Sequence, residues 1–424
     1  MPRRQNSGKL RFLAIAGILL ITILLASTAI LTFEFVYGNA DGIWHDLNVI
    51  RTAFKTLVIL SVVSLLLYGL IYGASFVKGT IGTLLVTALL LFGLEKLSLW
   101  LVNRNQPEPT TTTPSQPFLR PDHTEPSVFS DTLGVAAKPN WHIDWVPEYK
   151  ATRYDTVTIS TDSLGRRRTP LTDSLFRNRY AIFLGCSYTY GDGVSDNQTL
   201  PYYFQANSSS YRAYNYGFLA YSPLHALARL QQQDLERQIP QKDGFAVFTL
   251  IDDHLDRVIP ATRWIDMTQG RFPYLNEETM TTDGVFADKR RVYTRTVLGF
   301  QPTGVRQLLK WSYPRVHTAA HYEWLVKIIA KVQQEYIARF NNENFFVVVF
   351  PGNPISLETR QLFEQANVKL LDYAKLIPIK ENMLPFDSAH PAPVVYERVG
   401  QQLSKDIDSL LTKKREAEPM SASL

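Results

Sequence analysis

Three long apolar runs occupy the first hundred positions of the chain, a pattern typical of membrane-spanning helices. The runs 12–33 and 57–76 carry no charge, and the run 79–102 is interrupted only by Glu95 and Lys96. A helix needs about 20 apolar residues to cross the hydrocarbon core of a bilayer. The pattern therefore predicts a membrane region, 1–102, with about three transmembrane helices, at about 12–36, 55–76 and 79–102.

The residues before the first run predict the orientation of these helices. Four cations precede that run, namely Arg3, Arg4, Lys9 and Arg11, and basic flanks stay on the cytoplasmic side. Three crossings then place the chain after residue 102 outside the cytoplasm, as part of a multi-pass protein. In an alternative interpretation the first run is a cleaved signal peptide with small residues at 26–29. The other two runs would then form a hairpin, and the later chain would again lie outside.

After the membrane region the pattern changes to short apolar runs that alternate with helical periodicity. Residues 103–118 are rich in proline and threonine and predict a linker, and residues 413–424 predict a disordered tail. Strands are expected at 156–160, 180–184, 212–216, 245–251, 345–350 and 368–371. Helices are expected near 199–205, 223–237, 320–340, 356–366 and 393–411. This alternation predicts an α/β domain, 119–412, with a mostly parallel sheet covered on both faces.

One stretch, at about 257–314, does not follow the alternation. It contains aromatic residues, glycines and expected short hairpins such as 271–275. We interpret it as an insertion that forms either a lid or substrate wall, or a surface elaboration with no role in binding.

The composition of the chain excludes several classes of function. Hydrophobic residues make up 45% and charged residues 20% of the chain, which is enough for a packed core. The net charge is +5, but no long basic stretch is interleaved with aromatics, so nucleic-acid binding is not expected. The single cysteine, Cys186, excludes an intramolecular disulfide and a cysteine-rich zinc site. His317 and His321 have metal-ligand spacing without the glutamate of a zinc-protease motif, so we expect a solvated helix face, no metal and no cofactor.

The segment 184–191, which reads LGCSYTYG, joins the strand at 180–184 to a polar loop. Ser187 lies just past the end of that strand, where parallel sheets bind their ligands. In such a turn the hydroxyl can be exposed at the start of a helix and act as a nucleophile. The alternative is that Ser187 only caps the helix. Cys186 is interpreted as a small buried residue rather than as a second nucleophile.

Asp387 and His390 stand three residues apart in a polar segment before the last helix. This spacing lets the carboxylate orient the imidazole while the other ring nitrogen faces outward. Together with Ser187 they supply a nucleophile, a base and a group that orients the base, which is the set that ester hydrolysis needs.

These segments resemble the conserved blocks of SGNH/GDSL hydrolases. The segment 185–191 is similar to block I, with Cys186 in place of the family's aspartate, and 215–217 and 387–391 are similar to blocks II and V. The segment 160–166 is similar to the lead-in of extracytoplasmic bacterial members. The resemblance implies the family's flavodoxin-like three-layer sandwich over roughly 162–410.

The resemblance also implies roles for individual residues. Ser187 would be the nucleophile, His390 the base and Asp387 the residue that orients it. The backbone N–H groups of Ser187 and Gly217 would belong to the oxyanion hole.

Block III departs from the family pattern. The family has Gly-x-Asn-Asp there, whereas this chain reads LIDDH at 250–254. An ionised aspartate cannot donate a hydrogen bond, so neither Asp252 nor Asp253 replaces the asparagine well. His254 is the candidate third oxyanion donor, with Arg257 nearby, and the alternative is that His254 is held by neighbouring carboxylates. Loss of one oxyanion donor typically lowers the rate by about 10²–10³.

The sequence thus predicts a serine esterase or deacylase that acts through an acyl-enzyme on an acylated glycan or lipid outside the cytoplasm. Two alternatives remain open. One is an acyltransferase that uses the same three residues. The other is an inactive protein that binds envelope polysaccharide or assists envelope assembly.

Overall fold

The computed structural model describes residues 74–104, 126–171 and 173–417, together with isolated positions before residue 74. The chain divides into two compact units, Met1–Leu101 and Val102–Leu424.

The third apolar run forms helix α3, Ser75–Arg104, most of which belongs to the first unit. Among the described residues, one helix is long and apolar enough to cross a membrane, over Ser75–Val102 with a mean hydropathy of 1.8. The expected boundary at 76–79 is wrong, because the helix runs through it and the Lys78 N–H donates to the Ala74 carbonyl at 3.0 Å. A lone glycine such as Gly79 weakens a helix without ending it.

The other predicted membrane helices, at about 12–36 and 55–76, fall outside the described residues apart from isolated positions. So does the predicted linker beyond Arg104. Between those two runs, Ile43–Trp44 (β1) pairs antiparallel with Leu47–Asn48 (β2).

In the second unit, five strands form one wholly parallel sheet in the order β10-β9-β11-β14-β15. Their bounds are Arg179–Leu184 (β9), Tyr211–Asn215 (β10), Asp243–Leu250 (β11), Phe345–Val349 (β14) and Lys369–Asp372 (β15). Strands β9, β11 and β14 are almost entirely buried. Continuous apolar runs are what a parallel sheet with two covered faces requires, and the prediction of an α/β fold with a parallel sheet is confirmed.

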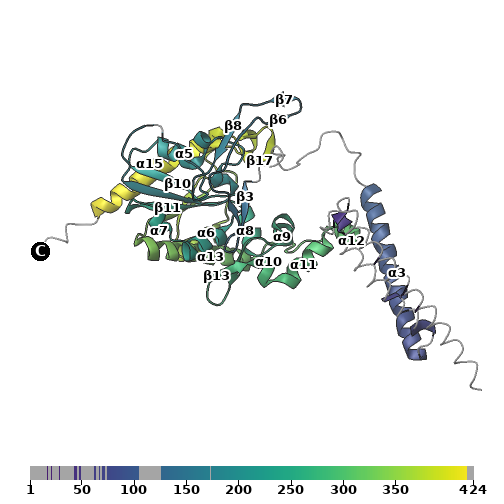
Figure 1. Cartoon of the computed structure of the whole chain (residues 1–424). Helices are drawn as coiled ribbons and strands as arrows, with labels where there is room; N and C mark the ends of the chain where they lie inside the picture. The colour runs from purple at the N-terminus through teal and green to yellow at the C-terminus, as the bar shows by residue number, and fades with distance from the viewer. Residues whose placement is uncertain are drawn as a thin grey trace, which may run out of the picture. The chain divides into compact units, whose positions relative to one another are not determined.

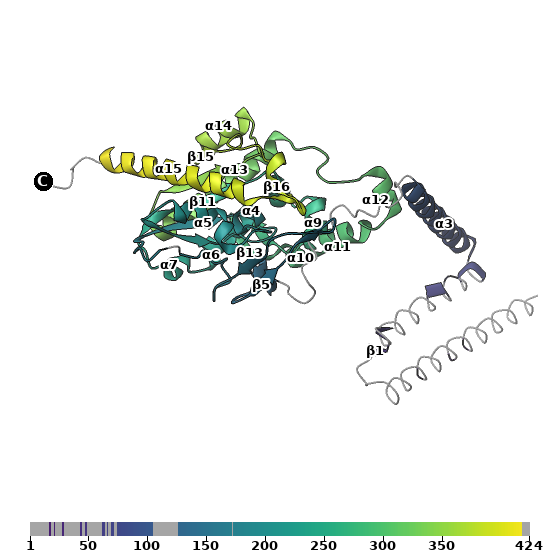
Figure 2. The ribbon, with the colours of Figure 1, turned by 90° about the horizontal axis from the view of Figure 1, so that it is seen from above.

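Helices cover both faces of this sheet (Figure 1). One face packs against α6 (Pro223–Gln232), α13 (Ala319–Phe340) and α14 (Leu357–Gln365). The other face packs against α5 (Leu200–Ala206) and α15 (Pro393–Ala417), and Figure 2 looks down on α15 as it crosses the strands. The unit therefore has three layers.

Two helix ends differ from the prediction. The helix expected at 223–237 is divided into α6 and α7 (Leu235–Gln238), because Gln233 is extended and turns the fully buried Leu235 into the core. Helix α15 continues to Ala417, where a tail was expected from 413. Lysine, arginine, glutamate and alanine at 413–417 are good helix formers.

The segment interpreted as an insertion is largely helical. A hairpin of β12 (Pro273–Asn276) and β13 (Thr281–Val285) lies where a hairpin was expected. Around it are five short helices, α8 (Asp253–Val258), α9 (Thr262–Thr268), α10 (Phe286–Lys289), α11 (Arg291–Phe300) and α12 (Gly304–Leu309). Short helices contribute little periodicity to a sequence.

Small antiparallel pairs precede and follow the main sheet. Before it lie β3 (Ser127–Ser130) with β4 (Gly134–Ala137), β5 (His142–Trp145) with β8 (Val157–Ser160), and β6 (Glu148–Tyr149) with β7 (Thr152–Arg153). Near the C-terminus β16 (Met383–Leu384) pairs with β17 (Asp387–Pro391). Strand β8 lies at the position expected for the first strand. The remaining elements are α4 (Ser187–Tyr190) and the 3-10 turns Asp196–Gln198 and Lys380–Asn382.

The strand order determines where a site can form. After β9 the chain crosses on the α5 face to reach β10, and after β10 it crosses on the α6 face to reach β11. The strands β9 and β11 are neighbours in the sheet, but the chain that leaves β9 runs over one face and the chain that leaves β11 runs over the other. In open parallel sheets this switch point, at the carboxyl ends of the strands, is where ligands bind. The segments that start at Gly185 and Ile251 both lie there.

Candidate active site

The turn that carries Ser187 follows β9 directly. Gly185 has φ +151°, and a Cβ on it would stand 2.2 Å from the Thr189 Oγ1 atom. Cys186 is completely buried, as predicted, and Ser187 is the first residue of α4. The first N–H groups of a helix have no partner within it. The turn thus presents Ser187 at the carboxyl edge of the sheet, with 8% of the residue exposed.

Contacts from two distant segments hold this turn. Asn215 Nδ2 donates to the Thr189 carbonyl at 2.9 Å, and Arg167 Nη1 donates to the Gly191 carbonyl at 3.1 Å. Gly217 lies against the same turn, where a Cβ would stand 2.7 Å from the Thr189 Cβ. A glycine at position 217 therefore allows the close approach of two backbones.

Asp387 and His390 form a direct pair on β17. The Asp387 Oδ2 atom and the His390 Nδ1 atom are 2.5 Å apart, and Asp387 Oδ1 accepts the Ala389 N–H at 2.8 Å. Burial disfavours the imidazolium, but the hydrogen bond to Asp387 and the charges of Asp192 and Asp387 outweigh it and raise the pKa of His390. The pKa of Asp387 is lowered, because the bonds from His390 and Ala389 outweigh its burial.

Tyr188 links this pair to the serine turn. Its hydroxyl donates to the Ala389 carbonyl at 2.9 Å, and its ring centroid lies 5.8 Å from that of His390. Burial, followed by the neighbouring Cys186 and the charges of Asp253 and Asp387, raises the pKa of this hydroxyl, so it stays protonated. Elements α4 and β17 are therefore neighbours, although Ser187 and His390 are distant in sequence.

The Ser187 hydroxyl does not hydrogen-bond to His390 in the described structure. In ligand-free sites such bonds are often long and tighten only when substrate is bound.

The proposed oxyanion donors are placed less favourably. The Gly217 N–H donates to the Asn215 Oδ1 atom at 3.0 Å, so it already has an acceptor. His254 is completely buried, its Nδ1 atom accepts the Ile251 N–H at 3.3 Å, and its ring lies 5.1 Å from that of Phe248. Burial, then the charge of Arg257 and the neighbouring imidazole of His225, hold the pKa of His254 well below its usual value. A neutral histidine with no exposed surface cannot contact a substrate in this conformation, so the geometry does not support the prediction for His254.

Within the described residues, neither the Asp252 nor the Asp253 carboxylate contacts His254, which is the contact that the alternative interpretation expected. Asp252 is exposed, and its N–H donates to the Asn353 Oδ1 atom at 2.9 Å. Burial of part of its carboxyl and the charge of Asp253 raise the pKa of Asp252. Asp253 instead pairs with Arg257, at 3.3 Å from Nη2.

Arg257 is a buried cation close to the site. Its Nη1 atom donates to the Tyr221 carbonyl at 2.7 Å, and its guanidinium lies 4.7 Å from the Trp264 ring centroid. Its charge opposes, without cancelling, the rise in the pKa of both His390 and Tyr188. The proximity of Arg257 was anticipated from the sequence, whereas the effects of Tyr188 and Asp192 on His390 were not. Tyr188 lies within the serine motif and Asp192 follows it directly, and this position is their sequence signal.

The two histidines with metal-ligand spacing have structural partners. His317 Nε2 lies 2.7 Å from the Asp256 Oδ1 atom, and His321 Nδ1 accepts the Thr318 N–H at the start of α13. Their rings are 6.2 Å apart.

No family model and no curated protein matches the chain. Among solved structures, it is similar to a carbohydrate acetylesterase from Sinorhizobium meliloti, with a TM-score of 0.32 and 11% identity over 55% of this chain and 99% of the other. An acetyl xylan esterase from the rumen bacterium Butyrivibrio proteoclasticus has a TM-score of 0.31 and 11% identity over 61% of this chain and 68% of its own. An acetylxylan esterase from Geobacillus stearothermophilus has a TM-score of 0.31 and 10% identity over 55% and 96%.

Proposed function

We propose that this protein is a serine esterase of the SGNH/GDSL type, with Ser187 as its nucleophile. The observation that carries the proposal is the 2.5 Å pair of Asp387 and His390, held beside the serine turn by Tyr188. Because Nδ1 is occupied by the carboxylate, Nε2 is the nitrogen that can take a proton from a hydroxyl. The contact between Asp387 and His390 supports the proposal that Asp387 orients the base.

The mechanism follows from these contacts. Ser187 Oγ attacks the carbonyl carbon of the ester while His390 Nε2 takes the hydroxyl proton. The imidazolium is stabilised by Asp387 and by the charge of Asp192. The tetrahedral intermediate expels the alcohol, which receives that proton, and leaves an acyl group on Ser187. Water then attacks with His390 again as base, which releases the acid and restores the serine.

The substrate and location are part of the proposal. We place the site outside the cytoplasm of a multi-pass protein, where it deacylates a glycan or lipid. The apolar helix α3 and the basic residues before residue 12 support this placement. A periplasmic reporter fused after Gln116 should be active, and activity of only a cytoplasmic reporter would overturn the placement.

Labelling of the full chain in detergent with a fluorophosphonate tests the nucleophile. Wild type should be labelled and Ser187→Ala should not. Ser222→Ala is a matched control, because Ser222 also contacts a histidine, His225, at 3.0 Å but is only 1% exposed. It should be labelled as wild type is. If Ser222→Ala loses labelling and Ser187→Ala keeps it, Ser187 is not the nucleophile.

A second candidate is a protein of this fold that binds an acylated polymer without cleaving it. The bond from the Gly217 N–H to Asn215 and the burial of His254 favour it, since both leave fewer donors for an oxyanion. A well-folded full chain that neither reacts with the fluorophosphonate nor hydrolyses short acyl esters would replace the esterase proposal with this one.

A further inference from the structure

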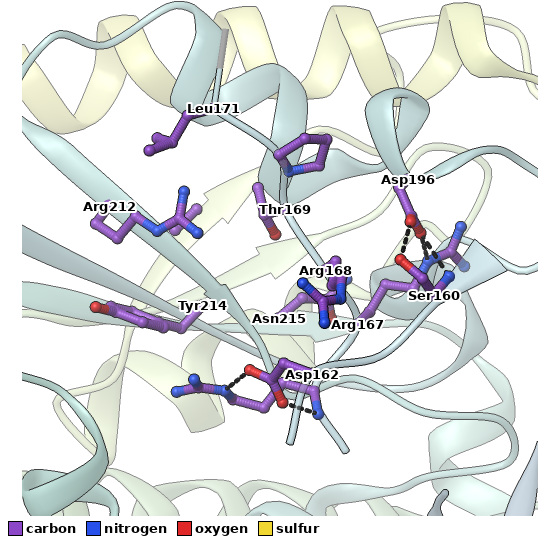
Figure 3. Close-up of a pocket in the computed structure, with 13 residues that line it drawn as sticks. Ser160, Asp162, Arg167, Arg168, Thr169, Leu171, Asp196, Arg212, Tyr214 and Asn215 are labelled. Atoms are coloured by element: carbon purple, nitrogen blue, oxygen red, sulfur yellow. Dashed lines mark hydrogen bonds and ion pairs between the residues drawn. The ribbon is translucent and has the colours of Figure 1, made fainter. Parts of the chain in front are cut away.

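A cavity of about 450 Å³ lies beside the edge strand β10, outside the candidate active site. One wall is β10 itself, and the other is the segment 160–171, which we call the strap. The strap crosses the strand edge, and Arg167 forms an antiparallel bridge to Asn215. Figure 3 shows that the cavity is lined mainly by polar side chains from these two segments.

The cavity contains more positive than negative charge. Four arginines line it, namely Arg166, Arg167, Arg168 and Arg212, against the two carboxylates of Asp162 and Asp196. Both carboxylates are already paired, Asp162 with Arg166 at 2.7 Å and Asp196 with Arg167 at 2.5 Å. Within the described parts of the chain, no carboxylate lies within ion-pair distance of the other two arginines.

Within the described residues, the hydrogen bonds of Arg168 and Arg212 all go to neutral groups. Arg168 Nε donates to the Thr161 carbonyl at 3.1 Å, and Arg212 Nη1 donates to the Gln205 Oε1 atom at 3.1 Å. Burial, with the nearby charges of Arg177 and Arg166, lowers the pKa of Arg212. An arginine has five N–H donors, so both keep donor capacity and charge that a bound anion can compensate.

A buried hydroxyl in the same cavity lacks a partner. Thr169 is only 4% exposed, and within the described residues its Oγ1 atom has no hydrogen-bond partner. Buried polar groups are nearly always hydrogen-bonded, so an exception calls for an explanation. Figure 3 shows Thr169 between Arg212 and Arg168, facing the same hollow.

We propose that this cavity binds an oxyanion, a carboxylate or a phosphate group, carried on a molecule of about the size of a sugar. Arg168 and Arg212 supply the charge and the guanidinium donors, and the Thr169 hydroxyl supplies a neutral donor. Guanidinium groups match the oxygens of carboxylate and phosphate closely. The volume of the cavity admits more than a bare ion, and the exposed side chain of Leu171 gives an apolar wall for the rest of the molecule.

The cavity adjoins the back of the serine turn. Asn215 and Arg167 both line the cavity, and the same two side chains hold the carbonyls of Thr189 and Gly191. A bound anion would therefore reinforce the turn that presents Ser187. The inference does not depend on the proposed esterase activity, because neither Ser187 nor His390 lines this cavity.

The test measures binding to the full chain in detergent micelles. Glucuronate and inorganic phosphate are the two probes, titrated separately by calorimetry and by ligand-observed NMR. At least one should bind, with an affinity that falls as salt is raised. Binding of glucuronate alone would indicate a carboxylate ligand, and binding of phosphate alone would indicate a phosphorylated one.

The variants assign the binding to these residues. Arg212→Gln and Arg168→Gln should each weaken binding about tenfold, the loss expected for one hydrogen bond to a charged group. Thr169→Val, which retains the shape of the side chain, should weaken it about threefold. The charge-matched control is Arg398→Gln, at an exposed position on α15, and it should bind as wild type does.

A thermal melt of each variant separates lost binding from lost folding. If Arg212→Gln does not fold, two milder variants provide the test: Arg168→Gln, at an exposed position, and Thr169→Val, which retains the shape of the side chain. If neither glucuronate nor phosphate binds to a folded wild-type chain, the proposal is wrong. Equal binding to wild type, Arg168→Gln and Thr169→Val would also overturn it.

Discussion

The segment of Asp387 and His390 and the segment that follows β11 both belong to the candidate site, but their polar groups are paired differently. On β17 a carboxylate and an imidazole bond to each other, and the pKa of His390 rises as a result. After β11 the imidazole of His254 turns into the core, and the carboxylate of Asp253 pairs with a buried arginine. The first arrangement supports proton transfer, whereas the second mainly supports packing.

This difference indicates that stabilisation of the oxyanion, rather than proton transfer, should limit the rate of the reaction. Proton transfer needs a correctly oriented base, which β17 supplies. Stabilisation of the oxyanion needs donors aimed at the substrate, and the altered block III offers Asp252, which can donate only when it is protonated. We therefore expect the same chemical change to have opposite effects in the two segments.

The largest effect is expected from Asp387→Asn. The amide cannot stabilise the imidazolium of His390 and favours the wrong tautomer, so kcat for a short acyl ester should fall about 10⁴-fold. Steady-state kinetics on the full chain measure this, with a thermal melt to show that the variant is folded. A fall of less than tenfold would show that the carboxylate does not serve the base.

The matched change in the other segment is Asp252→Asn. Asparagine restores the N–H donor that the family pattern has at block III. Asp252 makes no ion pair within the described residues, and its own N–H bond to Asn353 comes from the backbone, so the exchange disturbs neither. We expect kcat to rise by up to about 10²-fold, the lower end of the worth of one oxyanion donor. A fall in kcat would show that the carboxylate itself takes part.

The pH dependence of kcat/KM should report the protonation of His390. Because its pKa is raised in the folded protein, kcat/KM should increase with pH and level off only above the usual histidine value of about 6.5. The stability contribution has the opposite trend: it is fully present below the unfolded pKa and is lost as pH rises through the folded pKa. Asp192→Asn should move the inflection to lower pH, and an unchanged inflection would separate Asp192 from His390.

The smallest effect on activity is expected from His254→Leu. The change leaves the Ile251 N–H without its acceptor, which should destabilise the protein by about 1–3 kcal/mol in denaturant unfolding. The kcat of the folded variant should change less than tenfold, since His254 has no exposed surface. If kcat instead drops by about 10²–10³, the histidine does act as an oxyanion donor and the conformation must change on binding.

Much of the fold could be predicted because its signals are local. The runs at 180–184, 245–251 and 345–350 form buried strands of a parallel sheet, and the helices expected at 320–340 and 356–366 lie within a residue of those positions. The sequence did not predict the break between α6 and α7 or the short helices of the insertion. A segment of a few residues has no clear periodicity, and its conformation depends on the distant residues against which it packs. The sequence does not show which residues those are.

The same distinction applies to the site. Asp387 and His390 are three residues apart, so their pairing could be inferred from spacing, and the burial of Cys186 follows from its place between a buried strand and a turn. The bond from the Gly217 N–H to Asn215 and the inward turn of His254 depend on competition between nearby acceptors and on core packing, which spacing cannot resolve.

The sequence by itself therefore determined the parallel α/β architecture, the apolar N-terminal segment and the identity of the candidate nucleophile, base and orienting residue. These depend on periodicity, on short-range spacing and, for the roles of the three residues, on the resemblance to SGNH/GDSL motifs. Only the tertiary structure decided the strand order that brings β9 beside β11, the pairing of Asp253 with Arg257, and the gathering of Arg168, Thr169 and Arg212 in one cavity. These depend on contacts between segments far apart along the chain, which form only when the sheet and its covering helices pack together.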